Sequence, residues 1–215
     1  MAARLLLFVV ALVAVVCERA EAKEISLAPD AWEIRFSYGL PNHPSAEGSG
    51  WAFDFPMGTN CRGKKPCPGV HYVTTKYAEP IPPRSFLTLS FKVEAESSTV
   101  FNFKLAKDNI CDRPPASVRA FLQRAGDDLY EANNRFWSNS VSVVLAPGEH
   151  TMIVEFSPDQ WTNVDGERSE AGFAEMLKNV GNIGVTFGGG CFFGHGVNVS
   201  GGGGRFIMTR FELNP

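Results

Sequence analysis

Apolar and polar residues alternate with a period of two in many short stretches of this chain. Because successive side chains of a β-strand point to opposite faces, this period predicts strands that each carry one apolar face. Gly, Pro and Asn residues bound several of the stretches, as is typical of turns. The alternating segments are 34–38, 51–55, 70–74, 87–93, 101–105, 118–122, 141–145, 152–156, 183–187 and 207–213. In the segment around 118–122 the intervening residues Arg119, Phe121 and Gln123 are also large, which indicates a strand covered on both faces.

One segment has the period of a helix instead. Its apolar residues are spaced i, i+3, i+4 and i+7 and therefore share one helical face: Phe173, Met176, Leu177 and Val180. Many short strands with a single helix point to two packed antiparallel sheets. The sequence therefore predicts an all-β, antiparallel β-sandwich of jelly-roll type with one short helix, whose last strand pairs with the first ones. An immunoglobulin-like sandwich is the alternative, but the strands are numerous and the loops long for it.

The N-terminus has the pattern of an export signal. A positive charge precedes the apolar run 5–16, and residues 20–22 offer the small-x-small pattern that signal peptidase recognises. We expect residues 1–22 to be cleaved, leaving one domain, 23–215, that is secreted, or periplasmic if the source is a Gram-negative bacterium. The run is short for a permanent membrane span, so none is expected. An uncleaved anchor and a lipidated Cys17 remain alternatives.

Export also changes how the cysteines are interpreted. Cleavage of the signal segment removes Cys17 and leaves an even number of cysteines, which in an oxidising compartment favours disulfides. They are Cys61, Cys67, Cys111 and Cys191. The short spacing between Cys61 and Cys67 suits a local bridge, and a long-range bridge would then join the other two, although all three pairings stay open. A zinc site is the alternative, but the chain has no C-x-x-C pair with a histidine at ligand spacing.

Charge and motifs exclude several function classes. The chain holds 20 basic and 23 acidic residues, a net charge of −3 and no long run of either sign, so it lacks the basic footprint of nucleic-acid-binding proteins. No G-x-S-x-G or H-E-x-x-H motif is present, and no carboxylate pair stands out for glycoside hydrolysis. We therefore expect a binding protein with no catalytic residues and no cofactor.

The order of elements in the second half of the chain carries a family resemblance. The relevant stretches are "RFWSNSVSVVLAPGEHTMIVEFSPDQWTNVDG", "GFAEMLKNVGNIGVTFGGGCFFGHGV" and "GRFIMTRFEL". In these stretches we expect, in order, a strand, a Pro-Gly turn, a strand, a Trp-containing loop, a short helix ending in Asn-Val-Gly, a strand ending in Gly-Gly and a closing strand. This order resembles the galactose-binding-domain-like jelly rolls that include many carbohydrate-binding modules. The resemblance implies a sugar ligand. It also implies a structural calcium ion, with Asp30, Glu33 and Glu212 as candidate oxygen donors.

Sugar binding needs an aromatic platform and fixed polar groups. Trp161, in a polar loop, is the best stacking candidate and Trp137 the second, whereas Trp51 is in phase with Phe53 and Phe55 and is expected in the core. Packing at the end of the sandwich is the alternative for Trp161. The expected polar contacts come from Arg113, Asn109, Gln160 and His195.

Two glycine runs near the C-terminus enclose aromatic residues and a histidine. They match neither a P-loop nor a G-x-G-x-x-G fingerprint. We expect a loop, fixed by a bridge at Cys191, that presents Phe193 and His195 to a ligand; a hydrophobic lid over the core is the alternative. The triplet Asn198-Val199-Ser200 next to it matches the N-glycosylation sequon.

Three functions follow, in order of preference. The first is a secreted, non-catalytic carbohydrate-binding domain stabilised by disulfides. The second is a secreted or envelope-associated protein-interaction or structural domain without a sugar site. The third is a small carbohydrate-active enzyme, which would require two carboxylates or a His-Tyr-Arg cluster in one groove. The expected partner is accordingly a carbohydrate or an extracellular or envelope protein.

Overall fold

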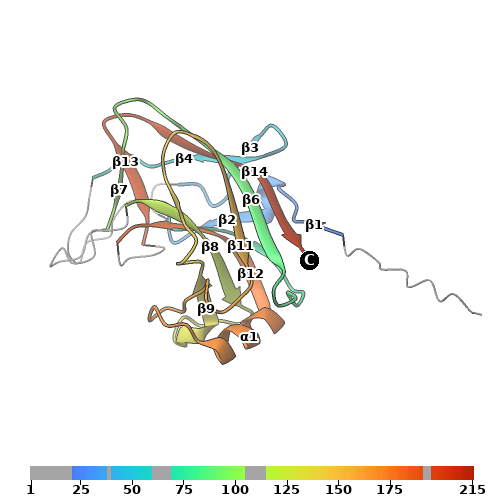
Figure 1. Ribbon diagram of the computed structural model, residues 1–215. Helices are drawn as coiled ribbons and strands as arrows, with labels where there is room; N and C mark the ends of the chain where they lie inside the picture. Colours follow the sequence, from blue (N-terminus) through green and yellow to red (C-terminus); the bar gives the residue numbers. More distant parts are fainter. Residues whose placement is uncertain (1–20, 38–39, 60–68, 105–114, 191–194) are drawn as a thin grey trace, which may run out of the picture.

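Two antiparallel β-sheets face each other in the protein (Figure 1). The computed structural model describes residues 21–37, 40–59, 69–104, 115–190 and 195–215. Sheet A has the strand order β11-β6-β14-β4-β3, with β1 also paired to β14. Its strands are β1 (Lys23–Glu24), β3 (Ser45–Glu47), β4 (Gly50–Asp54), β6 (Phe86–Ala95), β11 (Gly148–Glu155) and β14 (Gly204–Asn214).

Sheet B has the strand order β10-β8-β12-β5-β2, with β9 also paired to β8. Its strands are β2 (Trp32–Arg35), β5 (Tyr72–Lys76), β8 (Ser117–Arg124), β9 (Arg135–Trp137), β10 (Val143–Val144) and β12 (Val180–Gly188). A separate ribbon pairs β7 (Val100–Phe103) with β13 (Val197–Ser200). Short 3₁₀ turns lie at Pro29–Ala31 and Ala132–Asn134.

The strand order is that of a jelly roll. In chain order the roll consists of β4, β5, β6, β8, β9 with β10, β11, β12 and β14. Sheet A then contains its first, eighth, third and sixth strands side by side, and sheet B its second, seventh, fourth and fifth. The closing strand β14 pairs with β4, β6 and β1, as the sequence predicted. The all-β jelly-roll prediction is therefore confirmed.

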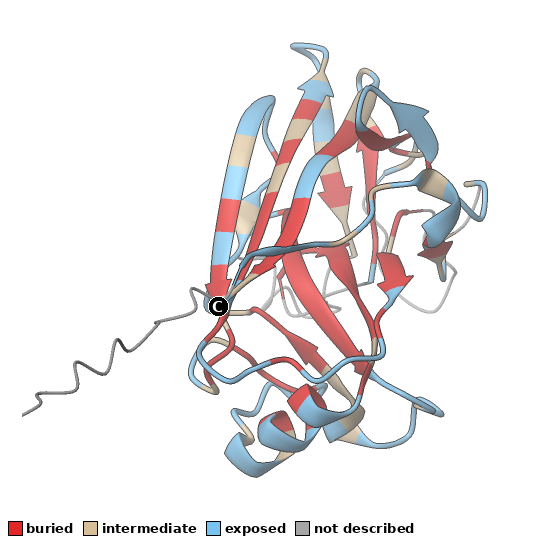
Figure 2. Ribbon diagram, turned by 90° about the vertical axis from the view of Figure 1, so that its right-hand side faces the viewer, coloured by how far each residue is buried: buried red, intermediate tan, exposed pale blue. Residues whose placement is uncertain are grey.

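The core lies between the two sheets and is rich in aromatic rings. Trp32 of β2 and Trp51 of β4 are fully buried with ring centroids 5.0 Å apart, which joins the sheets across the sandwich. The core placement expected for Trp51 is thus confirmed. Figure 2 shows buried residues along the central strands and exposed residues mainly in the loops and on the outer side of the helix. Burial of apolar surface of this extent is the main stabilising term of such a fold.

The α-helix α1 (Glu170–Lys178) lies at one end of the sandwich beside β8 and the 3₁₀ turn at Ala132–Asn134 (Figure 1). The Ser169 side chain accepts a hydrogen bond from the Gly172 N–H and so caps the first turn. Phe173, Met176 and Leu177 form the buried face, as predicted from their spacing, whereas Val180, predicted on the same face, lies beyond the end of the helix and is the first residue of β12. Within the described residues, no helix has the length and apolarity needed to cross a bilayer.

Several strand boundaries differ from the prediction. The predicted strand 34–38 is instead β2, because Phe36 adopts a left-handed backbone with φ 55° and turns the chain. The segment 141–145 contributes only the two residues of β10. The expectation that the strand around 118–122 is covered on both faces is confirmed, since Ser117 to Gln123 are all buried.

Candidate functional site

The outer face of sheet B carries a patch of aromatic and polar side chains. Strand alternation sends Val73, Ile183 and Leu122 into the core, so their neighbours point outward. Strand register aligns the outward residues in three rows across β2, β5, β12, β8 and β9. The rows are Arg35, Tyr72, Thr186 and Arg119; then Glu33, Thr74, Gly184, Phe121 and Trp137; then Lys76, Asn182, Gln123 and Arg135.

A pocket of about 200 Å³ opens in this face. Gly184 stands between Thr74 and Phe121 in the middle row, and a Cβ at this position would lie 2.2 Å from the Val73 carbonyl oxygen, so glycine allows β12 and β5 to pack closely there. The lining joins strands β2, β5 and β8 to the loops around them. It consists of Arg35, Phe36, His71, Tyr72, Thr74, Phe121, Gln123, Leu129, Arg135 and His195.

Two apolar residues at the rim are held in a strained backbone. Phe36 follows β2 and Leu129 lies in the loop between β8 and β9, with φ values of 55° and 72°. Both side chains are nevertheless exposed, at 52% and 45%. The Phe36 ring contacts Tyr72 edge-on at 5.8 Å, and the Arg35 guanidinium lies 5.3 Å from its centroid. Left-handed backbone in non-glycine residues is costly and clusters at functional sites, so this rim is a candidate ligand contact.

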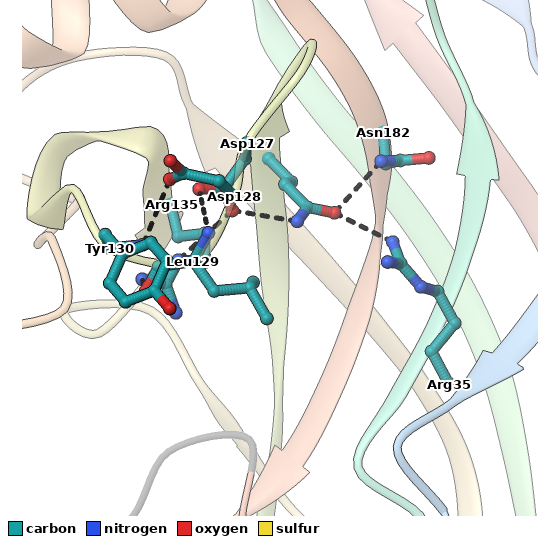
Figure 3. Close-up of polar contacts among 8 residues, drawn as sticks. Arg35, Asp127, Asp128, Leu129, Tyr130, Arg135 and Asn182 are labelled. Atoms are coloured by element: carbon teal, nitrogen blue, oxygen red, sulfur yellow. Dashed lines mark hydrogen bonds and ion pairs between the residues drawn. The ribbon is translucent and has the colours of Figure 1, made fainter.

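A chain of hydrogen bonds fixes the polar groups behind the pocket (Figure 3). The Gln123 Oε1 accepts from Arg35 Nη1 at 2.8 Å and from Asn182 Nδ2 at 2.9 Å. The Gln123 Nε2 donates to Asp127 Oδ2 at 2.8 Å, which fixes the orientation of the amide. Because Gln123 is hydrogen-bonded to Arg35, Asn182 and Asp127, these side chains are held in place before a ligand binds.

The same network anchors the loop that follows β8. The buried Asp127 carboxylate lies 3.3 Å from Arg135 Nε and accepts a hydrogen bond from the Leu129 N–H at 2.9 Å. Arg135 Nη2 donates to the Leu129 carbonyl oxygen at 2.8 Å. The strained backbone of Leu129 is therefore held from both sides by one ion pair.

Two titratable groups of the pocket have shifted pKa values. Burial raises the pKa of the Tyr72 hydroxyl to about 12, against the opposing effect of the nearby Arg135 and Arg35. Desolvation, and secondarily the charge of Lys104, lowers the pKa of His195 below its ordinary value. At neutral pH the phenol is therefore protonated and the imidazole is neutral.

The part of this face beyond the pocket is buried. Arg119 is 1% exposed, and burial lowers its pKa to about 10. Trp137 packs against Phe121 with centroids 5.2 Å apart, and its indole N–H has no acceptor within the described residues. Trp137 was predicted as the second stacking platform, but only 5% of its surface is accessible in the structure.

The prediction that Trp161 offers an exposed platform is wrong for this structure. Its side chain is fully buried and lies between Phe156 and Phe173, with both centroids 5.5 Å away. Its indole N–H donates to the Glu155 carbonyl oxygen at 2.9 Å. Gln160, predicted as a polar contact, instead accepts a hydrogen bond from the Glu155 N–H and closes the turn after β11. Phe156, directly after β11, and Phe173 of α1 therefore hold this loop against the core.

The remaining predicted site residues divide into two groups. His195 lines the pocket, as a ligand contact would. Arg113, Asn109 and Phe193 lie outside the described residues, as do the four cysteines of the proposed disulfides.

The predicted calcium ligands do not converge. Asp30 and Glu33 border a hollow beside β5, whereas Glu212 lies in β14 of the other sheet and is ion-paired with Arg210. Among the described residues, no three His, Cys, Asp or Glu side chains are grouped so as to hold a metal ion. The sequon residue Asn198 is 1% exposed within β13, and its Nδ2 donates to the Thr59 carbonyl oxygen at 3.2 Å.

Sequence reasoning missed most of the pocket residues. Arg35, Gln123 and Arg135 belong to strands far apart in the chain, and only strand register brings them together. One signal was available: Phe121 and Gln123 are large residues at the outward positions of a strand whose other face is apolar. Comparison with models of known protein families and with curated proteins finds no match for this chain. The functional argument therefore rests on the geometry of the pocket.

Proposed function

We propose that this protein is a carbohydrate-binding domain whose site is the pocket on the outer face of sheet B. The observation that carries the proposal is the combination of exposed aromatic surface with preorganised polar groups in one cavity. Phe36 and Tyr72 offer ring surface to the apolar face of a sugar. Arg135 lies beside them as a fixed donor for hydroxyl groups, and Gln123 holds Arg35 in position next to it.

The size of the pocket supports a small ligand. Its volume of about 200 Å³ is below the roughly 300 Å³ at which pockets for drug-sized ligands begin. It therefore suits one sugar ring, bound as the end or as one unit of a longer saccharide. The left-handed backbone of Phe36 keeps an apolar ring at the opening, where it would contact the next unit of such a chain.

The expected cellular setting is part of the same proposal. We propose that the domain is secreted, or periplasmic in a Gram-negative source, and that disulfides among the four cysteines that follow the export signal stabilise it. Both proposals rest on the export-signal pattern of residues 1–22 and on the even number of cysteines that follow. The jelly-roll topology agrees with the resemblance to galactose-binding-domain-like modules, but many unrelated functions share this fold.

A glycan array probed with the oxidised domain, residues 23–215, tests the binding function. Hits are then titrated by calorimetry with the wild type and with Phe36→Ala, which removes the exposed ring at the rim. The matched control is Ile153→Ala, because Ile153 is similarly exposed but lies on β11 of sheet A. We expect Phe36→Ala to weaken binding by about tenfold, within the range of one stacking contact, and the control to leave it unchanged.

The array also separates this function from the alternative of a protein-interaction domain. A well-folded sample that binds no glycan would contradict carbohydrate binding and favour a protein partner. Binding that resists Phe36→Ala but falls with Ile153→Ala would place the site on sheet A and contradict the location proposed here.

A polysaccharide lyase is a second candidate, favoured by one observation. The pocket brings together His71, Tyr72, His195 and two arginines, which is the His-Tyr-Arg cluster that such an enzyme needs. In β-elimination on a uronic acid, a base removes the proton beside the carboxylate, the bond to the leaving sugar oxygen breaks, and an acid protonates that oxygen. The neutral His195 suits the base and the protonated Tyr72 suits the acid.

The product of that reaction gives the test. Elimination leaves a double bond conjugated to the carboxylate, which absorbs in the ultraviolet. An increase in absorbance with oligogalacturonate that disappears in Tyr72→Phe would establish the lyase. Binding without any increase would leave the non-catalytic function.

A further inference from the structure

Arg35 and Arg135, the two arginines of the pocket lining, differ in whether a carboxylate neutralises their charge. Arg135 lies 3.3 Å from the buried Asp127 carboxylate, so its charge is compensated within the protein. Arg35 donates through Nη1 to the neutral amide of Gln123 and has no carboxylate partner among the described residues. A partly buried guanidinium without a counter-charge is a favourable place for an anion.

The guanidinium of Arg35 is also held in position. Gln123 Oε1, its acceptor, is fixed by Asn182 on one side and, through the amide nitrogen, by Asp127 on the other. Figure 3 shows Arg35 and Asn182 directed at this same amide. With Nη1 occupied, the edge formed by Nε and Nη2 has no acceptor among the described residues. That edge matches the two oxygens of a carboxylate, which Arg binds through two parallel hydrogen bonds.

The surroundings of Arg35 reinforce the preference. The described lining of the pocket holds no carboxylate, and of its two arginines only Arg35 lacks a carboxylate partner among the described residues. The whole chain, by contrast, carries a net charge of −3. A local positive site on an acidic protein selects anionic ligands and draws them to itself.

We propose that the ligand of this pocket is an acidic saccharide, a uronic acid unit whose carboxylate is bound by Arg35. The inference rests on the proposed carbohydrate-binding function and narrows its ligand class. In the bound state the Nε and Nη2 edge of Arg35 donates to the carboxylate, and Phe36 and Tyr72 contact the sugar ring. Gln123 acts as a positioning residue that holds Arg35 in place.

A matched ligand pair tests the carboxylate. Digalacturonate is compared by calorimetry with the neutral disaccharide in which both carboxyl groups are reduced to alcohols, and with a sulfated form of that disaccharide. We expect digalacturonate to bind at least about tenfold more tightly than the neutral sugar at low salt, and the difference to shrink as salt is added. Equal binding of the pair would overturn the inference, and tightest binding of the sulfated sugar would overturn the choice of a carboxylate.

Variants of Arg35 test the residue. Arg35→Met keeps the aliphatic stem and should abolish the preference for the acid, whereas Arg35→Lys keeps the charge without the paired donors and should retain part of it. The matched control is Arg168→Gln, which removes the same charge from an exposed residue outside the pocket lining. Circular dichroism of each variant confirms that it is folded before binding is compared. A preference that survives Arg35→Met in folded protein would overturn the assignment.

The outcomes distinguish this inference from the function on which it rests. If the array and the titrations yield neutral sugars only, and Phe36→Ala weakens their binding, the binding site stands and the acidic ligand is wrong. If no array glycan binds to folded protein, the carbohydrate-binding function itself is wrong and the inference falls with it.

Discussion

Replacing Trp161 by alanine tests whether this residue belongs to the core. The indole lies fully buried between Phe156 and Phe173, so the substitution removes two aromatic contacts and leaves a cavity. Such Trp→Ala changes cost about 3–5 kcal/mol of unfolding free energy. The Glu155 carbonyl also loses its hydrogen-bond donor, which adds about 1 kcal/mol. The expected loss is therefore about 4–6 kcal/mol, against a total stability of roughly 5–15 kcal/mol for a typical domain.

Urea denaturation and thermal melts of the domain give the measurement. For a chain of this size the loss corresponds to a decrease in Tm of about 8–24 °C. Trp161→Phe is the matched control, because it retains a ring between Phe156 and Phe173 and loses mainly the hydrogen bond, at a cost of about 1–2 kcal/mol. A Trp161→Ala variant with unchanged stability and lost glycan binding would refute the core placement and restore this residue as a ligand platform.

Three further predictions test other parts of the structure. Burial raises the Tyr72 pKa to about 12 from 10.0, so the folded state retains a proton that the unfolded state releases, and stability should fall between pH 10 and 12. The decrease in unfolding free energy is at most about 2.7 kcal/mol, from two pKa units of about 1.36 kcal/mol each. Urea denaturation at several pH values in this range should show a smaller decrease in stability for Tyr72→Phe than for the wild type. Equal decreases in the two proteins would contradict the burial of the hydroxyl. Gln123→Ala should lower the unfolding free energy by about 1–3 kcal/mol, because Arg35, Asn182 and Asp127 each lose a hydrogen-bond partner. A loss below about 0.5 kcal/mol in the same assay would show that this hydrogen-bond network is not formed. Asn198 should remain unmodified in a glycosylating host, because its side chain is buried and hydrogen-bonded to Thr59. Peptide mass spectrometry of the folded protein measures this. A glycan on Asn198 would contradict the placement of β13.

The strands could be predicted because their pattern is local. In the segment around Leu87 to Val93 the alternation of apolar and polar residues is complete, and it forms the central strand β6. The helix was found for the same reason, since its buried residues recur at helical spacing. Phe36 shows the limit of this reasoning: its left-handed backbone breaks an alternation that continues in the sequence.

The candidate site could be predicted only in part, because it is assembled by long-range pairing. Trp161 lies among polar residues in the sequence, yet Phe156, directly after β11, and Phe173 of α1 enclose it. Arg35 and Gln123 are 88 positions apart and meet only because β2, β5, β12 and β8 are neighbours in sheet B. Of the expected contacts, His195 lines the pocket, since the chain returns from β12 to the same face.

Chemical-shift mapping by NMR shows whether a glycan binds on the outer face of sheet B. The amide-labelled domain is titrated with the tightest ligand from the glycan array, and the shifted amides are assigned to strands. We expect the largest shifts at the C-terminal end of β2, in β5 and β8, and in the loop 125–131 around Leu129. Shifts confined to sheet A, in β6 and β11, would contradict this expectation.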